Sequence, residues 1–264
     1  MAKTERHIKE EMKKADVLIF TGDARAVKQS INQAFLDKVK DKKHFSVFNK
    51  TDLADEVAIR AWKDYFADNK ENVFFTDCVA KEGIKQISAY MSQLKESLRF
   101  QRELRVIITG IPNVGKSMLI NALANKSSAK TGNIPGVTRG VNWIRAKGDF
   151  YLLDTPGVLP TKFDTEYDGN VLASIGCVKE TVYSREDIAA FVINFLSENY
   201  PQLLLERYGV ECRGKEMLDV YEEIALKRGF KLRGDNIDYE RCARTILDEF
   251  KNGVIGRLSF GRPE

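Results

Sequence analysis

The chain has 264 residues, 43% of them hydrophobic, which allows one sizeable domain with a buried core and a second, smaller one. Its formal net charge of +4 is modest and does not by itself indicate a nucleic-acid-binding protein. The apolar runs are too short for a membrane span and the N-terminus lacks a secretory signal, so we expect a cytoplasmic protein.

The first part of the chain alternates short β-rich runs with stretches of helical periodicity. The expected strands are residues 17–21, 44–48, 72–76, 104–109, 142–146 and 150–153. The expected helices are residues 2–15, 30–40, 55–67, 83–100 and 116–124. This alternation predicts an α/β fold with helices on both faces of one sheet.

From about residue 184 the pattern changes to helices only. These expected helices are residues 184–199, 201–208, 215–227 and 237–251, with glycines between them. We therefore predict an α/β domain over residues 1–180, which includes a linker at 158–180, and a small all-α domain over residues 181–264.

The four cysteines are isolated in the sequence, with no CxxC pair that would suggest zinc or redox chemistry. They are Cys78, Cys177, Cys212 and Cys242. We expect them to be reduced and structural.

The first motif along the chain is NKTD at residues 49–52, directly after an expected strand. The Asp52 carboxylate can accept two hydrogen bonds from guanine N1 and N2, a donor pair that adenine lacks. A buried Asp52 would be unpaired against ATP, so the motif predicts a preference for GTP and GDP over adenine nucleotides. Asn49 and Lys50 belong to the same predicted site. Residues 76–79, with Thr76, Asp77 and Cys78 as site residues, are the expected backbone contact to the guanine ring.

A phosphate loop, GIPNVGKS, follows at residues 110–117 between an expected strand and an expected helix. Its glycines let backbone N–H groups turn toward the phosphates, Lys116 reaches the β and γ oxygens, and Ser117 supplies a magnesium ligand. The other nucleotide contacts predicted in this loop are Asn113, Val114, Gly115 and Met118.

The third motif, DTPG at residues 154–157, ends the last expected strand. We expect Asp154 to hold magnesium through water and the Gly157 N–H to meet the γ-phosphate. Thr138, in a polar loop at residues 126–140, is the candidate that closes on magnesium when a γ-phosphate is present, with an ordinary surface threonine as the alternative.

The order of these motifs is unusual, because in small GTPases the phosphate loop comes first and the specificity motif last. We therefore predict a circularly permuted P-loop GTPase domain with a Ras-like sheet. Val158 stands where signalling GTPases have a glutamine that orients water, so intrinsic turnover is expected to be slow. Asn113 is a candidate ligand for K⁺, which would replace an arginine finger; the alternative is a solvent-facing asparagine.

These features resemble the circularly permuted GTPases of the bacterial ribosome biogenesis GTPase A family, also called YlqF, over nearly the whole chain. Matching segments outside the nucleotide motifs are DAR at 23–25, PGVT at 135–138, ERYG at 206–209, KRG at 227–229 and GRLSF at 256–260. The resemblance implies a cytoplasmic factor that binds the maturing large ribosomal subunit and leaves it on GTP hydrolysis.

The resemblance also implies that the C-terminal domain contacts ribosomal RNA. Candidate phosphate contacts are Lys227, Arg228, Lys231, Arg233 and Arg257, although most such side chains on helices are simply solvated. We expect a monomer in solution.

One departure concerns a histidine that the family carries in an N-terminal Pro-Gly-His-Met sequence. Aligned from residues 23–25, that methionine corresponds to Met1, so the histidine would precede this chain and His7 does not take its role. Either the start lies upstream or the group is lost. A ribosomal-RNA-binding scaffold with weak or decayed GTPase activity is the alternative function, and a GTPase serving RNA modification or membrane signalling is a third.

The permutation suggests a mechanism, because residues 158–180 run from the γ-phosphate sensor directly into the helical domain. We expect GTP to fix the two domains in an orientation that binds the ribosomal subunit, and GDP to release them.

Overall fold

The computed structural model describes residues 15–39, 41–98, 102–124, 143–146, 149–155, 159, 163–234 and 236–263. The chain divides into two compact units. The first is Met1–Thr161 together with Ser259–Glu264, and the second is Lys162–Leu258.

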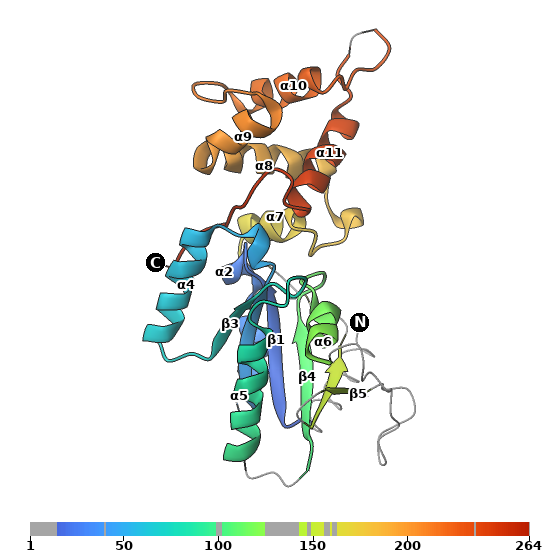
Figure 1. Ribbon diagram of the computed structural model, residues 1–264. Coiled ribbons are helices and arrows are strands. Elements are labelled where there is room, and N and C mark those ends of the chain that lie inside the picture. The colour runs from blue at the N-terminus through green and yellow to red at the C-terminus, as the bar shows by residue number, and fades with distance from the viewer. Residues whose placement is uncertain are drawn as a thin grey trace. The chain divides into compact units, whose positions relative to one another are not determined.

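Six strands in the described part of the first unit form one sheet (Figure 1). They are β1 (Val17–Asp23), β2 (Lys43–Asn49), β3 (Val73–Thr76), β4 (Leu104–Gly110), β5 (Trp143–Ala146) and β6 (Phe150–Asp154). Their order is β3-β2-β1-β4-β6-β5, and every neighbouring pair is parallel except β5 with β6. The six strands predicted from the sequence are thereby confirmed.

Helices cover both faces of this sheet. They are α2 (Val27–Ser30), α3 (Gln33–Val39), α4 (Glu56–Asp68), α5 (Ile84–Ser97) and α6 (Lys116–Ala124). On one face, Ile87 of α5 and Leu119 of α6 pack against Val106 and Ile108 of β4. On the other face, Trp62 of α4 packs with Phe48 of β2 in a separate cluster. The α/β class predicted from the alternating pattern is confirmed.

The predicted helix at residues 30–40 corresponds to α3, but it begins at Gln33, and the chain forms the short helix α2 before it. α2 ends at Ser30 and Ile31 is extended, with ψ of 117°. The Ser30 hydroxyl is turned inward and accepts a hydrogen bond from the Asp23 N–H at 3.0 Å. This hydrogen bond holds the last residue of α2 against the end of β1.

The second unit is helical in its described residues. It contains α7 (Glu166–Ser174), α8 (Arg185–Asn199), α9 (Pro201–Tyr208), α10 (Met217–Lys227) and α11 (Tyr239–Lys251). α8 packs against each of the other four. The four helices predicted from the sequence are present, and the class of a small all-α unit is confirmed.

The predicted linker at residues 158–180 contains α7, so the second unit begins at Lys162 and not at residue 181. Thr165 caps α7 by accepting a hydrogen bond from the Asp168 N–H at 3.1 Å. Val171 and Leu172 are buried, and α7 packs on α8 and α11. This packing makes α7 part of the helical unit.

The last residues return to the first unit. The Phe260 N–H donates to the Arg25 carbonyl oxygen at 2.7 Å, and Trp62 Nε1 donates to the Gly261 carbonyl oxygen at 3.3 Å. The helical unit is therefore an insertion between residues 161 and 259, a connection that the sequence analysis did not foresee.

All four cysteines are buried and free of disulfides. Burial raises the pKa of Cys78 to about 11 and that of Cys242 to about 12, which keeps both as thiols. In the described part of the chain, no helix combines the length and the apolar character that crossing a membrane requires.

Candidate nucleotide-binding site

The three sequence motifs lie at the same edge of the sheet because each follows a parallel strand. β2 ends at Asn49, β4 at Gly110 and β6 at Asp154. The chain moves outward from β1 to β3 on one side and from β4 to β6 on the other, so the strand order reverses between β1 and β4. Open α/β sheets bind ligands at such a reversal, beyond the carboxyl ends of the strands.

The loop between β4 and α6 has the backbone of a phosphate-binding loop. Asn113 has φ of 60° and Gly115 has φ of 95°, so both lie in the left-handed region. Lys116 is only 8% exposed, and its Nζ donates to the Ile111 carbonyl oxygen at 2.8 Å across the loop. With the first turn of α6 behind it, the loop is suited to anions.

Two glycines allow the phosphate loop to approach β1 and the NKTD motif closely. A Cβ on Gly110 would lie 2.0 Å from the Thr21 carbonyl oxygen of β1, and a Cβ on Gly115 would lie 2.2 Å from Asn49 Nδ2. Neither position has room for a side chain. The close approach at Gly115 joins the phosphate loop to the NKTD motif.

Ser117 and Asp154 meet in an open depression of about 570 Å³. Its lining residues are Pro112, Asn113, Gly115, Lys116, Ser117, Met118, Asp154 and Thr155. Ser117 Oγ donates to Asp154 Oδ2 at 2.6 Å, and Thr155 Oγ1 ties the end of β6 to the Ile108 carbonyl oxygen at 2.9 Å.

The hydroxyl and carboxylate oxygens of Ser117 and Asp154 are hard donors that suit Mg²⁺. In the described part of the chain, no group of three or more His, Cys, Asp or Glu side chains could hold a metal ion.

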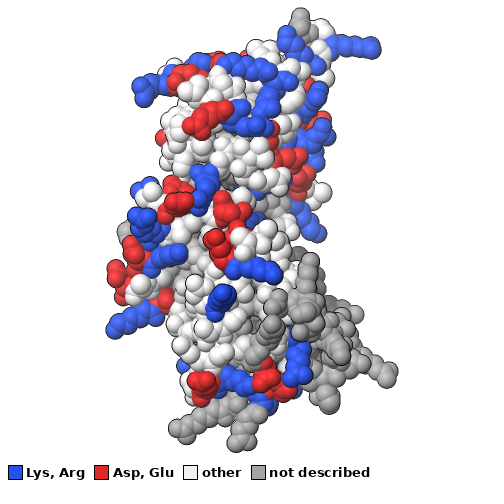
Figure 2. Space-filling model, in the orientation of Figure 1, with Lys and Arg blue, Asp and Glu red and all other residues white. Residues whose placement is uncertain are grey.

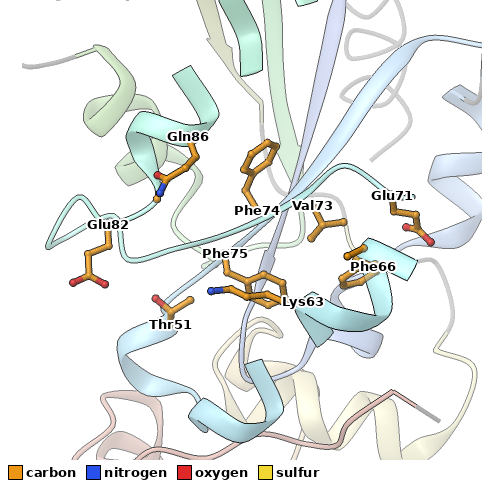
Figure 3. Close-up of a pocket in the computed structure, with 11 residues that line it drawn as sticks. Thr51, Lys63, Phe66, Glu71, Val73, Phe74, Phe75, Glu82 and Gln86 are labelled. Atoms are coloured by element: carbon orange, nitrogen blue, oxygen red, sulfur yellow. The ribbon is translucent and has the colours of Figure 1, made fainter. Parts of the chain in front are cut away.

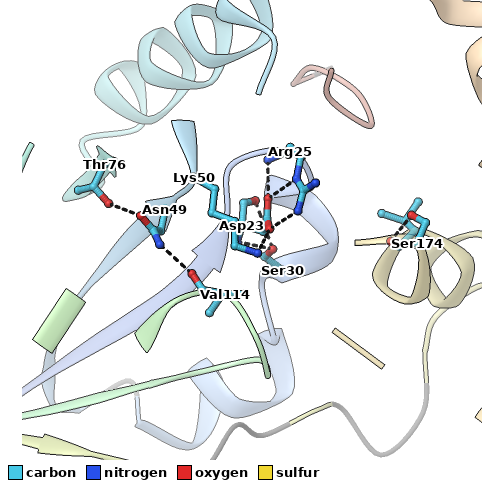
Figure 4. Close-up of polar contacts among 9 residues, drawn as sticks. Asp23, Arg25, Ser30, Asn49, Lys50, Thr76, Val114 and Ser174 are labelled. Atoms are coloured by element: carbon cyan, nitrogen blue, oxygen red, sulfur yellow. Dashed lines mark hydrogen bonds and ion pairs between the residues drawn. The ribbon is translucent and has the colours of Figure 1, made fainter. Parts of the chain in front are cut away.

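Asn49 joins the phosphate loop to the predicted base-binding loop (Figure 4). It is 2% exposed, and its Nδ2 donates to the Val114 carbonyl oxygen at 3.0 Å. Its Oδ1 accepts from the Cys78 N–H at 3.1 Å and from Thr76 Oγ1 at 3.3 Å. One side chain therefore sets the distance between the two loops.

Asp52 lies in the short 3₁₀ helix Thr51–Leu53 and is exposed. Burial raises the pKa of its carboxyl, and the negative charge of Asp77 adds to the rise. Asp77 itself closes a turn, because its Oδ1 accepts from the Val79 N–H at 2.7 Å and the Ala80 N–H at 3.0 Å.

The Asp23 carboxylate binds Lys50. The sequence analysis gave Asp23 only as part of a segment that resembles the family. Asp23, 0% exposed, contacts Lys50 Nζ through Oδ2 at 2.9 Å (Figure 4). Arg25 donates to the same carboxylate from Nε at 3.0 Å and NH2 at 2.9 Å. Burial alone would raise the pKa of Asp23, but the charges and hydrogen bonds of Arg25 and Lys50 outweigh it and hold that pKa well below its usual range.

A second cavity, of about 470 Å³, lies along the edge strand β3 (Figure 3). Its lining combines the rings of Phe66, Phe74 and Phe75 with polar and charged side chains, and Lys63 Nζ lies 5.8 Å from the centre of the Phe75 ring. Thr51 is its only lining residue from the NKTD motif. The phosphate loop does not line this cavity but lines the depression beside Lys116, which is therefore the candidate phosphate site.

The structure brings together most residues that the sequence analysis assigned to the site. Around the depression and at the end of β2 lie Asn49, Lys50, Asp52, Thr76, Asp77, Cys78, Asn113, Val114, Gly115, Lys116, Ser117, Met118 and Asp154. Thr138, Gly157, Val158 and His7 lie outside the described residues. Asp23 and Arg25 are the additions, and their sequence signals were the DAR segment shared with the family and its place directly after a buried strand.

Comparisons with known proteins match this arrangement. Residues 105–223 match a family model described as 50S ribosome-binding GTPase. The chain is 37% identical to ribosome biogenesis GTPase A of Bacillus licheniformis, over 100% of this chain and 96% of that protein. It is 30% identical to the protein of that name from Thermotoga maritima, over 99% and 92%.

Solved structures of YlqF from Thermotoga maritima are also similar. The GNP-bound form matches with a TM-score of 0.71 and 27% identity, covering 99% of both chains. The GDP-bound form matches with a TM-score of 0.70 and 26% identity, covering 97% of this chain and 99% of that one.

Proposed function

The chain belongs to the ribosome biogenesis GTPase A family, and on that premise we propose that it is a GTP-hydrolysing assembly factor that binds the immature large ribosomal subunit in its GTP state and leaves after hydrolysis. The observation that carries this proposal is the joined site. Asn49 connects the phosphate loop at Val114 to the base-binding loop at Cys78. This connection holds the two loops in place for one nucleotide, which supports a working GTPase over the scaffold.

The residues divide the work on GTP. Lys116 would bind the β and γ oxygens, while Asn49, Lys50 and Asp52 with the loop at Thr76, Asp77 and Cys78 would select guanine. Ser117 and Asp154 would hold Mg²⁺, which when bound neutralises charge on the phosphates. Thr138 and Gly157 are proposed to contact the magnesium site and the γ-phosphate.

Potassium dependence is part of the proposal. Asn113 lies beside Lys116 in the lining of the depression, with the left-handed backbone that asparagine tolerates better than most residues. Because Val158 cannot orient water, a cation at Asn113 would supply charge that the chain otherwise lacks. Turnover is expected to be faster in K⁺ than in Na⁺, and equal rates in both ions would remove Asn113 from this role.

We propose that the helical unit binds ribosomal RNA. Two of its basic candidates already have internal partners, since Lys227 pairs with Glu223 at 3.1 Å and Arg228 with Glu249 at 3.4 Å. Lys231, Arg233 and Arg257 are exposed and are candidates for phosphate contacts as well. Figure 2 shows acidic side chains among the basic ones on the face drawn, so charge alone does not mark the surface.

The experiment that tests the function measures GTP turnover in potassium buffer with and without purified large ribosomal subunits, with ATP as the control nucleotide. We expect slow turnover alone and strong stimulation by subunits for GTP only, by a monomer that works in the cytoplasm. Tight GTP binding without turnover in either condition would favour the scaffold. Equal affinity of the GTP and GDP forms for the subunit would contradict release by hydrolysis.

A further inference from the structure

The last described residues, 259–263, are held tightly by the first unit. Ser259 and Phe260 are 5% and 6% exposed. The Phe260 N–H donates to the Arg25 carbonyl oxygen at 2.7 Å, Ser259 Oγ accepts from the Asp55 N–H at 3.2 Å, and the Gly261 carbonyl oxygen accepts from Trp62 Nε1 at 3.3 Å. We call residues 259–263 the terminal strap.

The partners of the terminal strap flank the NKTD motif on both sides. Asp55 caps the start of α4, three positions after Asp52, by accepting from the Val57 N–H at 2.7 Å. Trp62 lies two turns further along α4 and is 8% exposed. The strap therefore fixes the helix that leaves the guanine-specificity loop.

Arg25 flanks the motif from the other side. Asp23 pairs in register with Asn49 across β1 and β2, and the Ala24 N–H donates to the Asn49 carbonyl oxygen at 2.8 Å. Arg25 comes next in the chain. Its carbonyl oxygen accepts a hydrogen bond from the strap, and its guanidinium donates to the Asp23 carboxylate. A displaced strap would therefore disturb the carboxylate that binds Lys50.

Lys50 needs such support because its backbone is left-handed, with φ of 66°, a conformation that residues with a Cβ seldom adopt. Its Nζ is fixed at 2.9 Å from Asp23 Oδ2 while its side chain remains 22% exposed. The side chain is thus fixed at one end and partly exposed, so it could lie along a bound nucleotide.

We propose that the terminal strap is a positioning element for guanine recognition: it holds Arg25 and the start of α4, and through Asp23 it fixes Lys50. Asp23, Arg25 and Ser259 are positioning residues, and Lys50 is the group that meets the nucleotide. This inference rests on the proposed guanine-binding role of residues 49–52 and adds that the far end of the chain sets how long the nucleotide stays bound.

The test uses the full chain carrying Ser259→Ala and Trp62→Phe together, which removes two hydrogen bonds of the strap and keeps the indole site filled by a ring. Dissociation of fluorescently labelled GDP is expected to be roughly three- to ten-fold faster, the factor that a lost hydrogen bond of ordinary strength produces. Ser184→Ala is the matched control, because Ser184 caps α8 by accepting from the Asp187 N–H at 3.2 Å in the helical unit. The control should leave GDP dissociation unchanged.

A double-mutant cycle with Lys50→Met separates positioning from general destabilisation. If the strap acts through Lys50, the strap variant changes GDP affinity much less in the Lys50→Met background than in the unaltered one. An equal fold-change in both backgrounds, or unchanged GDP dissociation in the strap variant, would overturn the proposal. GDP against ADP binding by the unaltered protein tests the guanine site separately, and neither measurement involves ribosomes.

Discussion

At the scale of single residues, Asn49 makes more of the hydrogen bonds that hold the candidate site together than Asp52 does. Its buried amide satisfies three groups, on Val114, Thr76 and Cys78, whereas Asp52 is exposed at the entrance to the base-binding loop. The sequence predicts both as nucleotide contacts, but it cannot show this difference. The burial and the hydrogen-bond partners of Asn49 and Asp52 depend on how three loops meet. The NKTD sequence alone does not specify that arrangement.

Replacing Asn49 by alanine is expected to lower the free energy of unfolding by about 3 kcal/mol, because the Val114 carbonyl and the Cys78 N–H lose their partner. Urea unfolding followed by circular dichroism measures the loss. Thr76→Val removes the bond of 3.3 Å to Asn49 and a weak contact of 3.7 Å to Cys78 Sγ, and it should cost about 1 kcal/mol. Similar losses in the two variants would argue against Asn49 as the connection between the loops.

A pH dependence of GDP affinity follows from Asp52. Guanine N1 and N2 donate hydrogen bonds, so they bind the ionised carboxylate, and burial followed by the charge of Asp77 raises the pKa of Asp52. As the pH falls through that pKa, the carboxylate takes up a proton and GDP affinity falls. We expect the fall at a higher pH than the ordinary aspartate value of about 3.9 would give. Titration of labelled GDP from neutral pH downward measures it.

Asp77→Asn provides the control for this titration. Asparagine keeps the oxygen that accepts from the Val79 and Ala80 N–H groups, but it removes the negative charge beside Asp52. The fall in GDP affinity should therefore move to lower pH. An unchanged midpoint would show that Asp77 does not act on Asp52.

At the scale of elements, the strands were predictable and some helix boundaries were not. Val106, Ile107 and Ile108 form a buried apolar run next to charged Arg105, and such a run identifies a strand of a parallel sheet. The break between α2 and α3 depends instead on the hydroxyl of Ser30 reaching Asp23 on another element. α7 was missed as a helix although its Thr165 cap can be recognised in the sequence.

Glu249 of α11 joins three elements of the helical unit. It accepts from Arg207 Nε at 2.9 Å, Tyr208 OH at 2.9 Å and Arg228 NH2 at 3.4 Å. Burial alone would raise the pKa of Glu249, but the hydrogen bonds from Arg207 and Tyr208 and the charge of Arg228 lower it. Its stabilising effect is present above the unfolded-state pKa of about 4.3 and is lost as pH falls through the lower folded-state pKa.

Glu249→Gln is expected to destabilise the helical unit by about 2 kcal/mol at neutral pH, because two arginines lose their shared negative charge. The difference should shrink as the pH falls and the unaltered Glu249 becomes protonated. Chemical unfolding at several pH values measures both effects. Glu240→Gln is the matched control. The Glu240 side chain is 77% exposed and lies 3.8 Å from Arg185, so its replacement should change the free energy of unfolding by less than about 0.5 kcal/mol.

At the scale of the whole molecule, the meeting of the three motifs at one edge of the sheet was predictable, and the connection of this edge to residues 259–261 was not. Three motifs that each follow a parallel strand must meet at one edge of the sheet, so Asn49, Lys116 and Asp154 could be assigned to one site from sequence order alone. Ser259 meets Asp55 across 204 positions. No periodicity or local propensity carries information over that separation.

The insertion of the helical unit gives the whole molecule two covalent connections between its units, after Thr161 and before Ser259. One follows the Asp154 motif and the other leads into the terminal strap at Arg25. The first connection follows a motif of the proposed nucleotide site, and the second leads to Arg25, which binds the Asp23 carboxylate. We expect the nucleotide state to govern ribosome binding through them, without a separate sensor.

Lys116→Ala tests this expectation. Lys116 Nζ contacts the Ile111 carbonyl oxygen inside the loop, so its loss should change the free energy of unfolding by no more than about 1 kcal/mol. GTP binding should fall by at least about a hundred-fold, because a charge-assisted contact to phosphate is lost. GTP should then no longer increase the affinity for purified large subunits in a sedimentation assay.

Lys215→Ala is the control, because it removes an exposed lysine paired with Glu223, and it should leave that GTP effect intact. If Lys116→Ala retained a GTP-dependent increase in subunit affinity, nucleotide binding at this site would not be what controls the ribosome-bound state.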